Sequence, residues 1–387
     1  MASSAPKRED ATTMPATKWP IANLSPQPKV DVKGLFEWGL KDPAGLAKFL
    51  EEEDPLGVAV ACPSNFRCPP KQERFSEPDI RDHAVEEEFK TGKGFVYYQH
   101  VRKAGGTGFC EMATRNMEKG QIPPYHCMPD NRGGMATPPW SNASYLLDNM
   151  KEKGYRVTAN EWDALPASHL ELPGAVFATT FRHPVDRWYS QYRFEHVEHR
   201  DGSKPDAIRK PFKPWYDQVK NFFMGDNYYV KAFCGMENLP EEELLKDVDR
   251  QGNPRHVNNL YWSYRKFSNW GSEVTWAQFQ SAMEILRRFN LVLILDFVED
   301  DMWALKKALG WTEPPKQVLP HLQQAKRSNK KSIPARDVLP PKDYEDMVKT
   351  NVFDLLLFHW AKRLNLERSA CHFDGKMGDG PMPGSAR

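Results

Sequence analysis

The chain has 387 residues, and its 53 Lys and Arg against 52 Asp and Glu give a formal net charge of +1. A chain of this length can bury a full core without disulfides or metals, and 40% hydrophobic with 27% charged residues excludes a body that is disordered or membrane-embedded. The balanced charge argues against a protein that coats nucleic acid. The 12% aromatic residues and 32 prolines suggest a globular body with braced loops, as in enzymes that cover a ligand.

The ends of the chain and its cysteines bear on its compartment. No run approaches the about 18 apolar residues of a membrane span, and the first 20 residues lack the apolar core of a secretory signal. As written, the chain is therefore predicted to be cytoplasmic, with the Golgi lumen as the alternative. No CxxC pair occurs among the six cysteines, so no structural zinc site is expected. Cys62 and Cys68 could close a small loop, but reduced and mostly buried thiols are favoured without an export signal.

Three regions are expected along the chain. Residues 1–30 are rich in Pro, Ser, Ala and Thr, a composition typical of a disordered extension. Residues 31–365 are expected to form one domain, of which 31–90 show a mixed pattern. Residues 366–387 are expected to be a flexible tail.

Strands and helices alternate from residue 95 onward. Strands are expected at Phe95–Val101, Tyr155–Ala159, Ala175–Phe181 and Leu291–Leu295. Helices are expected at Thr107–Met117, from Pro184 onward, and at Asn227–Phe233, Trp276–Phe289, Asp300–Leu309 and Asp343–Leu364. This alternation predicts an α/β domain with a parallel sheet, in which ligands bind beyond the carboxyl ends of the strands.

The first motif follows the first expected strand and reads His-Val-Arg-Lys-Ala-Gly-Gly-Thr-Gly-Phe over residues 100–109. Glycines between a strand and a helix let backbone N–H groups surround an anion, and the helix N-terminus adds its positive end. Lys103 adds a point charge. The lysine of the ATPase P-loop follows its glycines, whereas Lys103 precedes them, so the nucleotide-triphosphatase signature is absent. The alternative is an ordinary glycine turn with a solvated lysine.

The second motif starts at Arg182, at the end of the third expected strand. Ser190 lies two helical turns further on, on roughly the same face, and a guanidinium with a hydroxyl suits one phosphate group. In the alternative, Arg182 pairs with Asp186 and Ser190 packs passively. Two anion sites at adjacent strand ends suit a nucleotide that carries phosphate at both its 5′ and its 3′ position.

Together the two motifs resemble those of sulfotransferases that use 3′-phosphoadenosine 5′-phosphosulfate (PAPS), and most closely the carbohydrate enzymes of the heparan and uronyl 2-O-sulfotransferase group. The resemblance covers about residues 95–365. Residues 103–108 match the first family element, and Arg182, Pro184, Arg187 and Ser190 match the second, with His183 where the family usually has Asp. The resemblance implies the sulfotransferase fold, a single P-loop-like domain with a central parallel sheet flanked by helices.

The resemblance also implies roles for individual residues. Lys103 is expected to neutralise charge on the bridging oxygen during in-line transfer. A basic loop is expected to close over the nucleotide. The implied cofactor-binding residues are Arg102, Lys103, Ala104, Gly105, Gly106, Thr107, Gly108, Arg182, Ser190, Arg327 and Ser328.

The family takes its general base from the strand end between the two motifs, which indicates Glu161 here. A carboxylate would serve if burial beside Trp162 raised its pKa. The alternative is a glutamate that caps the following helical turn. Asp163, His169 and His126 are the reserve candidates.

The expected function is transfer of the sulfuryl group from PAPS to an acceptor hydroxyl, leaving adenosine 3′,5′-bisphosphate and requiring no metal. A carbohydrate acceptor is expected, with contacts in the segments 120–140 and 200–215. The alternatives are a small cytosolic alcohol or phenol, a nucleotide or small-molecule kinase, and an inactive nucleotide-binding module. No nucleic-acid partner and no transmembrane segment are expected, and the oligomeric state is open.

Overall fold

The computed structural model describes residues 30–60, 63–129, 135, 139–140, 142–161, 164–194, 211–221, 224–235, 273–298, 302–314 and 334–371. Residues 1–29, the loop with Arg327 and Ser328, and residues 372–387 lie outside this part of the chain. The strands are β1 (Phe95–Gln99), β2 (Val157–Asn160), β3 (Ala175–Phe181) and β4 (Leu291–Ile294). The main helices are α1 (Val32–Lys41), α2 (Pro43–Glu52), α3 (Ala84–Lys90), α4 (Gly106–Asn116), α5 (Ala143–Lys153), α6 (Pro184–Arg193), α7 (Phe212–Val219), α8 (Tyr228–Phe233), α11 (Trp276–Arg288), α12 (Met302–Leu309), α14 (Ala335–Val338), α15 (Pro341–Thr350) and α16 (Val352–Ala370).

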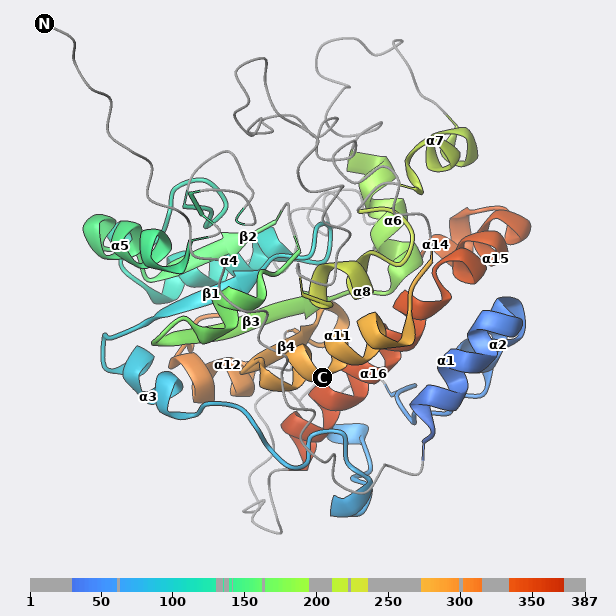
Figure 1. Cartoon of the computed structure of the whole chain (residues 1–387), viewed down its shortest axis with the longest axis horizontal. Helices are drawn as coiled ribbons and strands as arrows, with labels where there is room; N and C mark the ends of the chain where they lie inside the picture. The colour runs from blue at the N-terminus through green and yellow to red at the C-terminus, as the bar shows by residue number, and fades with distance from the viewer. Residues whose placement is uncertain are drawn as a thin grey trace, which may run out of the picture.

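The four strands form one parallel sheet in the order β2-β1-β3-β4, which confirms the predicted α/β architecture (Figure 1). Gln99 at the end of β1 is in register with Asn160 of β2 and with Thr179 of β3. After β1 the chain adds β2 on one side of β1, and it then crosses to add β3 on the other side of β1. The crevice between the carboxyl ends of β1 and β3 is therefore the topological switch point, where parallel sheets bind ligands.

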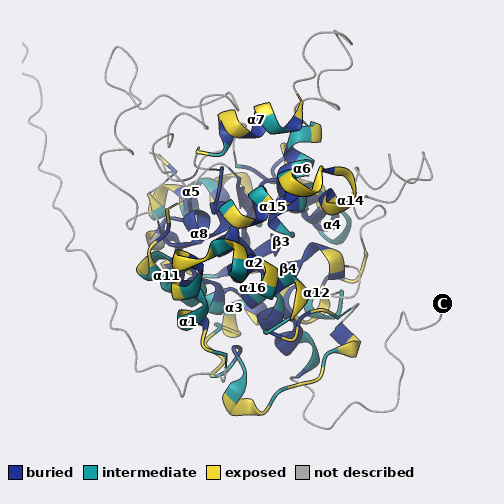
Figure 2. Ribbon diagram, turned by 90° about the vertical axis from the view of Figure 1, so that its right-hand side faces the viewer, coloured by how far each residue is buried: buried dark blue, intermediate teal, exposed yellow. Residues whose placement is uncertain are grey.

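Helices cover both faces of the sheet, and alternate strand residues enter two separate cores. Phe95 and Tyr97 of β1 belong to the core shared with α1, α2, α11 and α16, whereas Val96 and Tyr98 belong to the core shared with α3, α4 and α12. Figure 2 shows the buried strands inside a shell of helices whose outer sides are exposed. Burial on both faces explains the nearly continuous apolar character of the strand sequences.

The segment 31–90, which shows only a mixed pattern in the sequence, contains helices α1, α2 and α3. The side chains of Asp31 and Asp42 cap α1 and α2 by accepting hydrogen bonds of 2.9 Å from the backbone N–H groups of Gly34 and Gly45. Aspartate is among the preferred capping residues, so these two positions were the available sequence signal. The α1–α2 pair lies at the opposite end of the molecule from α5 (Figure 1).

The long helix predicted at Asp343–Leu364 is two helices, because the chain breaks at Asn351 between α15 and α16. The Asn351 amide donates to Asp226 Oδ1 at 2.9 Å and accepts from the Trp188 indole at 3.3 Å, so it joins α6 and the start of α8 to the C-terminal helices. Helix α16 then continues to Ala370. The flexible tail expected from residue 366 is therefore wrong for residues 366–371.

The prediction of reduced thiols is wrong for four cysteines. Disulfides join Cys68 to Cys371 and Cys110 to Cys127, while Cys234 is buried and free. Because Cys68 pairs with Cys371, it closes no small loop with Cys62, which lies outside the described residues. Spacing in the sequence could not reveal a pair separated by 303 positions.

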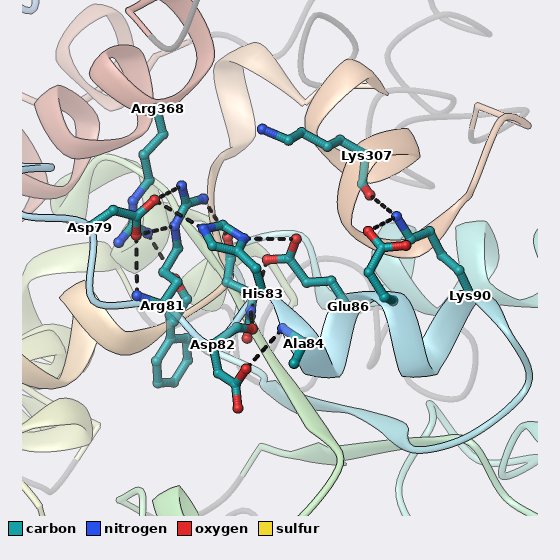
Figure 3. A network of polar contacts seen from close by, with 12 residues as sticks. Asp79, Arg81, Asp82, His83, Ala84, Glu86, Lys90, Lys307 and Arg368 are labelled. Carbon is teal, nitrogen blue, oxygen red and sulfur yellow. Dashed lines mark hydrogen bonds and ion pairs between the residues drawn. The ribbon is translucent and has the colours of Figure 1, made fainter.

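A polar network at the amino ends of the strands, opposite the switch point, joins the segment before β1 to the start of β4 (Figure 3). The Asn290 amide donates to Asp82 O at 2.8 Å and to Glu86 Oε1 at 2.9 Å. The His83 ring lies 3.1 Å from both Asp79 Oδ2 and Glu86 Oε2. These contacts satisfy one another, so we interpret the network as structural. Among the described residues, no helix combines the length and the apolar character that crossing a bilayer requires.

The disulfide between Cys68 and Cys371 is expected to stabilise the domain, because it cross-links positions 303 residues apart. The double substitution Cys68→Ser with Cys371→Ser should lower the free energy of unfolding by about 2–5 kcal/mol. Urea unfolding under non-reducing conditions measures this difference. Equal stability of the parent and the variant would contradict the pairing. A reducing agent should lower the free energy of unfolding of the parent toward that of the variant.

Candidate functional site

The loop between β1 and α4 (residues 100–105), where the sequence predicts an anion site and which we call the anion loop, turns sharply. Lys103 (φ 63°) and Gly105 (φ 101°) adopt left-handed conformations, and no side chain caps the first turn of α4. Left-handed backbone is costly for Lys103, so the surrounding packing must impose it. The first backbone N–H groups of α4 therefore face the switch point without a capping side chain, an arrangement suited to an anion.

Packing as well as conformation requires glycine in this loop. A Cβ added to Gly105 would lie 2.7 Å from Leu295 Cδ1, and one added to Gly106 would lie 1.8 Å from Nε2 of His100. His100 is 5% exposed and sits at the end of β1 directly beneath the loop. Its ring thus supports the anion loop from below, a role that the sequence interpretation missed. The sequence places His100 at the start of the first motif but gives no sign of its contact with Gly106.

The two sequence motifs meet in space. Nη1 of Arg182 donates to the carbonyl oxygen of Lys103 at 3.4 Å, and the hydroxyl of Tyr229 donates to the carbonyl oxygen of Arg182 at 2.5 Å. Burial lowers the pKa of Arg182, while the charges of Asp186 and Asp296 oppose this shift. Asp186 accepts the backbone N–H of Ala335 at 2.7 Å. Among the described residues no carboxylate forms an ion pair with Arg182, so the alternative pairing with Asp186 is not formed.

The other residues predicted in the second motif divide into two groups. Ser190 is half-buried on α6, and its hydroxyl has no hydrogen bond to the described part of the chain. Arg187 is 1% exposed, donates to Met224 O at 3.2 Å and lies over the ring of Tyr228, so its role is in the core. In the first motif, Ala104 is fully buried and Thr107 is half-buried.

Arg102, Glu161 and Gln191 form a buried cluster beside the anion loop. Nη1 of Arg102 donates to Glu161 Oε1 at 2.9 Å, and its Nε donates to Gln191 Oε1 at 3.0 Å. His100 Nδ1 lies 4.0 Å from Glu161 Oε2. Arg102 therefore links the ends of β1 and β2 to α6. Its guanidinium forms an ion pair with a carboxylate, whereas the Arg182 guanidinium forms none with the described residues.

The condition under which Glu161 would serve as the base, a pKa raised by burial, is not met. Burial does push the pKa upward, but the charges of His100, Arg102, His126 and Lys103 outweigh it and hold the pKa below its ordinary value. Burial lowers the pKa of His100, against the opposing charge of Glu161. We assign the lowered pKa of Glu161 mainly to Arg102, since a desolvated histidine stays neutral. An ionised, paired Glu161 is a weak proton acceptor.

The reserve candidates for the base occupy different places. His169 is fully buried, with its ring nitrogens 3.0 Å from Tyr97 Oη and 3.0 Å from Trp140 O, so it packs against β1 away from the switch point. Trp162 and Asp163 lie outside the described residues. His126 is exposed on a turn near the end of β2.

The Lys103 side chain extends toward the end of α6. Its Nζ lies 4.0 Å from the centre of the Phe194 ring, a distance typical of a cation–π contact. The charge of Lys103 also acts on Glu161 and His100. Lys103 therefore belongs to the same charged cluster as the ends of β1 and β2.

His183 turns away from the anion loop and is held by Glu51 of α2. Glu51 Oε1 lies 3.3 Å from His183 Nε2 and accepts from the hydroxyl of Tyr344 at 2.7 Å, and Glu51 Oε2 accepts from Arg336. Burial opposes ionisation of Glu51, but the contacts with His183, Tyr344 and Arg336 together lower its pKa to about 2. This clamp fixes the start of α6, and with it the position of Arg182.

No family model, no curated protein and no solved structure matches the chain. Within the described residues, no group of three or more His, Cys, Asp or Glu side chains is arranged to hold a metal ion.

The contact between His100 and Gly106 predicts a selective effect of a single methyl group. Gly106→Ala should lower the free energy of unfolding by about 1–3 kcal/mol, because the added Cβ overlaps the buried ring. Gly120→Ala is the matched control, since a Cβ at Gly120 meets nothing within 4 Å. Chemical denaturation compares the two variants, and equal effects would contradict the contact. Adding His100→Ala to Gly106→Ala should recover part of the loss.

The Glu51 clamp predicts an acid-dependent contribution to stability. A carboxyl whose pKa falls from 4.5 to about 2 on folding stabilises the protein above pH 4.5, and this contribution is lost as the pH falls toward 2. Glu51→Gln should therefore reduce stability at pH 7 and flatten the loss between pH 5 and pH 3. Urea unfolding at several pH values measures both effects. The exposed neighbour Glu52, changed to Gln, is the control, and a Glu51 variant with its parent's acid profile would refute the clamp.

Proposed function

We propose that the protein is a PAPS-dependent sulfotransferase with the sulfotransferase variant of the P-loop-like fold. The observation that carries this proposal is the hydrogen bond from Arg182 to the carbonyl of Lys103. It brings a half-buried guanidinium, which forms no ion pair with a carboxylate of the described chain, against a glycine loop at the switch point. Two anion-binding elements in contact suit one nucleotide with phosphates on both sides of its ribose.

The residues present fit such a donor by their chemistry. The backbone N–H groups at the start of α4 and the ammonium of Lys103 would hold the 5′ side, and Arg182 with Ser190 would hold the 3′-phosphate. PAPS supplies an activated sulfuryl group. Lys103 would neutralise the charge that develops on the departing oxygen, which is an interaction stronger in the transition state than in the ground state.

Glu161 is proposed to act as a positioning residue. Its ion pair holds Arg102 against Gln191 of α6, so loss of this carboxylate would leave a buried, uncompensated guanidinium. The lowered pKa of Glu161 argues against the role of general base that the sequence suggested for it.

We propose a carbohydrate hydroxyl as the acceptor and the Golgi lumen as the compartment. Disulfides persist in oxidising compartments and are rare in the cytosol, and the described chain contains two. This favours the secretory route over the cytosolic prediction, and hence a glycan over a cytosolic phenol. The basic loop with Arg327 and Ser328 stays part of the proposal on the resemblance alone.

The test is transfer of labelled sulfate from PAPS to desulfated heparin, chondroitin and 4-nitrophenol. We expect transfer to a glycan. Adenosine 3′,5′-bisphosphate should raise the melting temperature, while ATP with Mg²⁺ should not. Stabilisation by ATP alone would instead indicate a kinase, and stabilisation by the bisphosphate without transfer would indicate an inactive binding module.

Two variants should separate binding from chemistry. Arg182→Ala should weaken bisphosphate binding about tenfold or more, because a hydrogen bond to a charged group contributes about 1.5–3 kcal/mol. Lys103→Ala should lower the transfer rate about 100-fold or more with a smaller loss of affinity. Calorimetric titration and initial-rate assays measure the two effects. Equal loss of affinity in both variants would contradict the division of roles.

A further inference from the structure

The turn at residues 125–128 has an unusual backbone conformation, and two contacts attach it to the rest of the domain: one disulfide and one hydrogen bond. His126 (φ 48°) and Cys127 (φ 60°) are both left-handed, a conformation that costs energy in residues with a side chain. The turn is closed by a hydrogen bond of 2.8 Å from Met128 N to Tyr125 O. Something outside the turn must therefore hold it in place.

Two contacts supply this constraint, and both lead to the candidate site. The disulfide joins Cys127 to Cys110 on α4, the helix that begins at the anion loop. The carbonyl oxygen of Cys127 accepts the backbone N–H of Ala159 in β2 at 2.8 Å, two residues before Glu161. The turn is thus fastened to the two elements whose ends form the charged cluster.

The exposed part of the turn carries an imidazole. Cys127 and Met128 are buried, whereas Tyr125 is 48% exposed and His126 is exposed. The two rings lie edge to face with centres 4.8 Å apart. His126 has no hydrogen bond to any residue that the structure describes.

His126 lies next to Cys127, whose carbonyl oxygen bonds to Ala159 of β2, and therefore near the strand end that carries Glu161. Its charge acts on Glu161 from the end of β2 and on His100 from the end of β1, together with the charges of Arg102 and Lys103. Glu161 must give up its ion pair with Arg102 to accept a proton, whereas the imidazole of His126 has no hydrogen bond to break among the described residues.

We propose that His126, held in place by the disulfide between Cys110 and Cys127, is the general base for the acceptor hydroxyl; this inference rests on the proposed function. A ring nitrogen of His126 takes the hydroxyl proton as the acceptor oxygen forms its bond to the sulfur of PAPS. The bond between that sulfur and the 5′-phosphate oxygen breaks, and its electron pair stays on the phosphate oxygen, beside Lys103. The products are the sulfate ester and adenosine 3′,5′-bisphosphate.

The first test removes the imidazole. His126→Ala should lower kcat for sulfate transfer to desulfated heparin about 10²–10⁴-fold, the usual contribution of a general base. The melting shift produced by adenosine 3′,5′-bisphosphate should stay as in the parent, which shows that the variant is folded and binds nucleotide. Because the position is exposed, added imidazole should restore part of the rate.

The second test releases the turn while keeping the histidine. Cys110→Ser with Cys127→Ser should lower kcat about tenfold or more, because a displaced base is a poor base. When His126→Ala is already present, the same two cysteine substitutions should not lower kcat any further. Cys68→Ser with Cys371→Ser is the matched control, since it removes a disulfide far from the turn in sequence and should lower stability without this effect on kcat.

The outcomes separate the inference from the function on which it rests. Sulfate transfer that is unchanged in His126→Ala, or a lost rate that imidazole does not restore, would overturn the role of His126. Additive losses from the disulfide and the histidine would overturn the role of the disulfide. A chain that binds the bisphosphate but transfers sulfate to none of the three acceptors contradicts the proposed function and the inference together.

Discussion

The site depends on one constraint, the register of β1 with the strands on either side of it. Because Gln99 pairs with Asn160 on one side and with Thr179 on the other, β1 and β2 end at the same level, and β3 continues only to Phe181. Lys103, Glu161 and Arg182 each follow within a few residues of those positions. A shift of the register would separate the anion loop from Arg182 and Arg102 from Glu161.

Three cationic side chains gather at this edge of the sheet, those of Arg102, Lys103 and Arg182. Arg102 pairs with Glu161, whereas Arg182 feels the charges of Asp186 and Asp296 without a direct ion pair to either. A desolvated cation with no counter-charge is costly in the free protein and favours binding of an anion. The formal net charge of +1 for the whole chain gives no sign of this local group of cations.

The sequence predicts the strands and helices of the fold better than the long-range contacts that hold them together. All four strands, and the helices after β1, β3 and β4, follow from periodicity and from Gly and Pro signals that act locally. The break at Asn351 could not be predicted, because its cause is a set of hydrogen bonds to α6 and the start of α8, more than 120 residues away. The disulfides and the Glu51 clamp likewise join distant segments.

The same division holds within the candidate site. The two motifs were expected at adjacent strand ends, and the structure brings them into contact, with the carboxyl end of β2 on the other side of β1. The raised pKa that Glu161 would need as a base is not found, and its pairing with Arg102 could not be predicted because it depends on side-chain geometry that spacing does not reveal. His100 was overlooked because its contact with Gly106 exists only once the loop has turned back over the strand.

The most direct test of the central claim is a crystal structure of the protein with adenosine 3′,5′-bisphosphate. The account predicts the 5′-phosphate on the backbone N–H groups of residues 106–108 beside Lys103, and the 3′-phosphate within hydrogen-bond distance of the Arg182 guanidinium. A bisphosphate bound elsewhere, or one that leaves Arg182 without a phosphate contact, would contradict it.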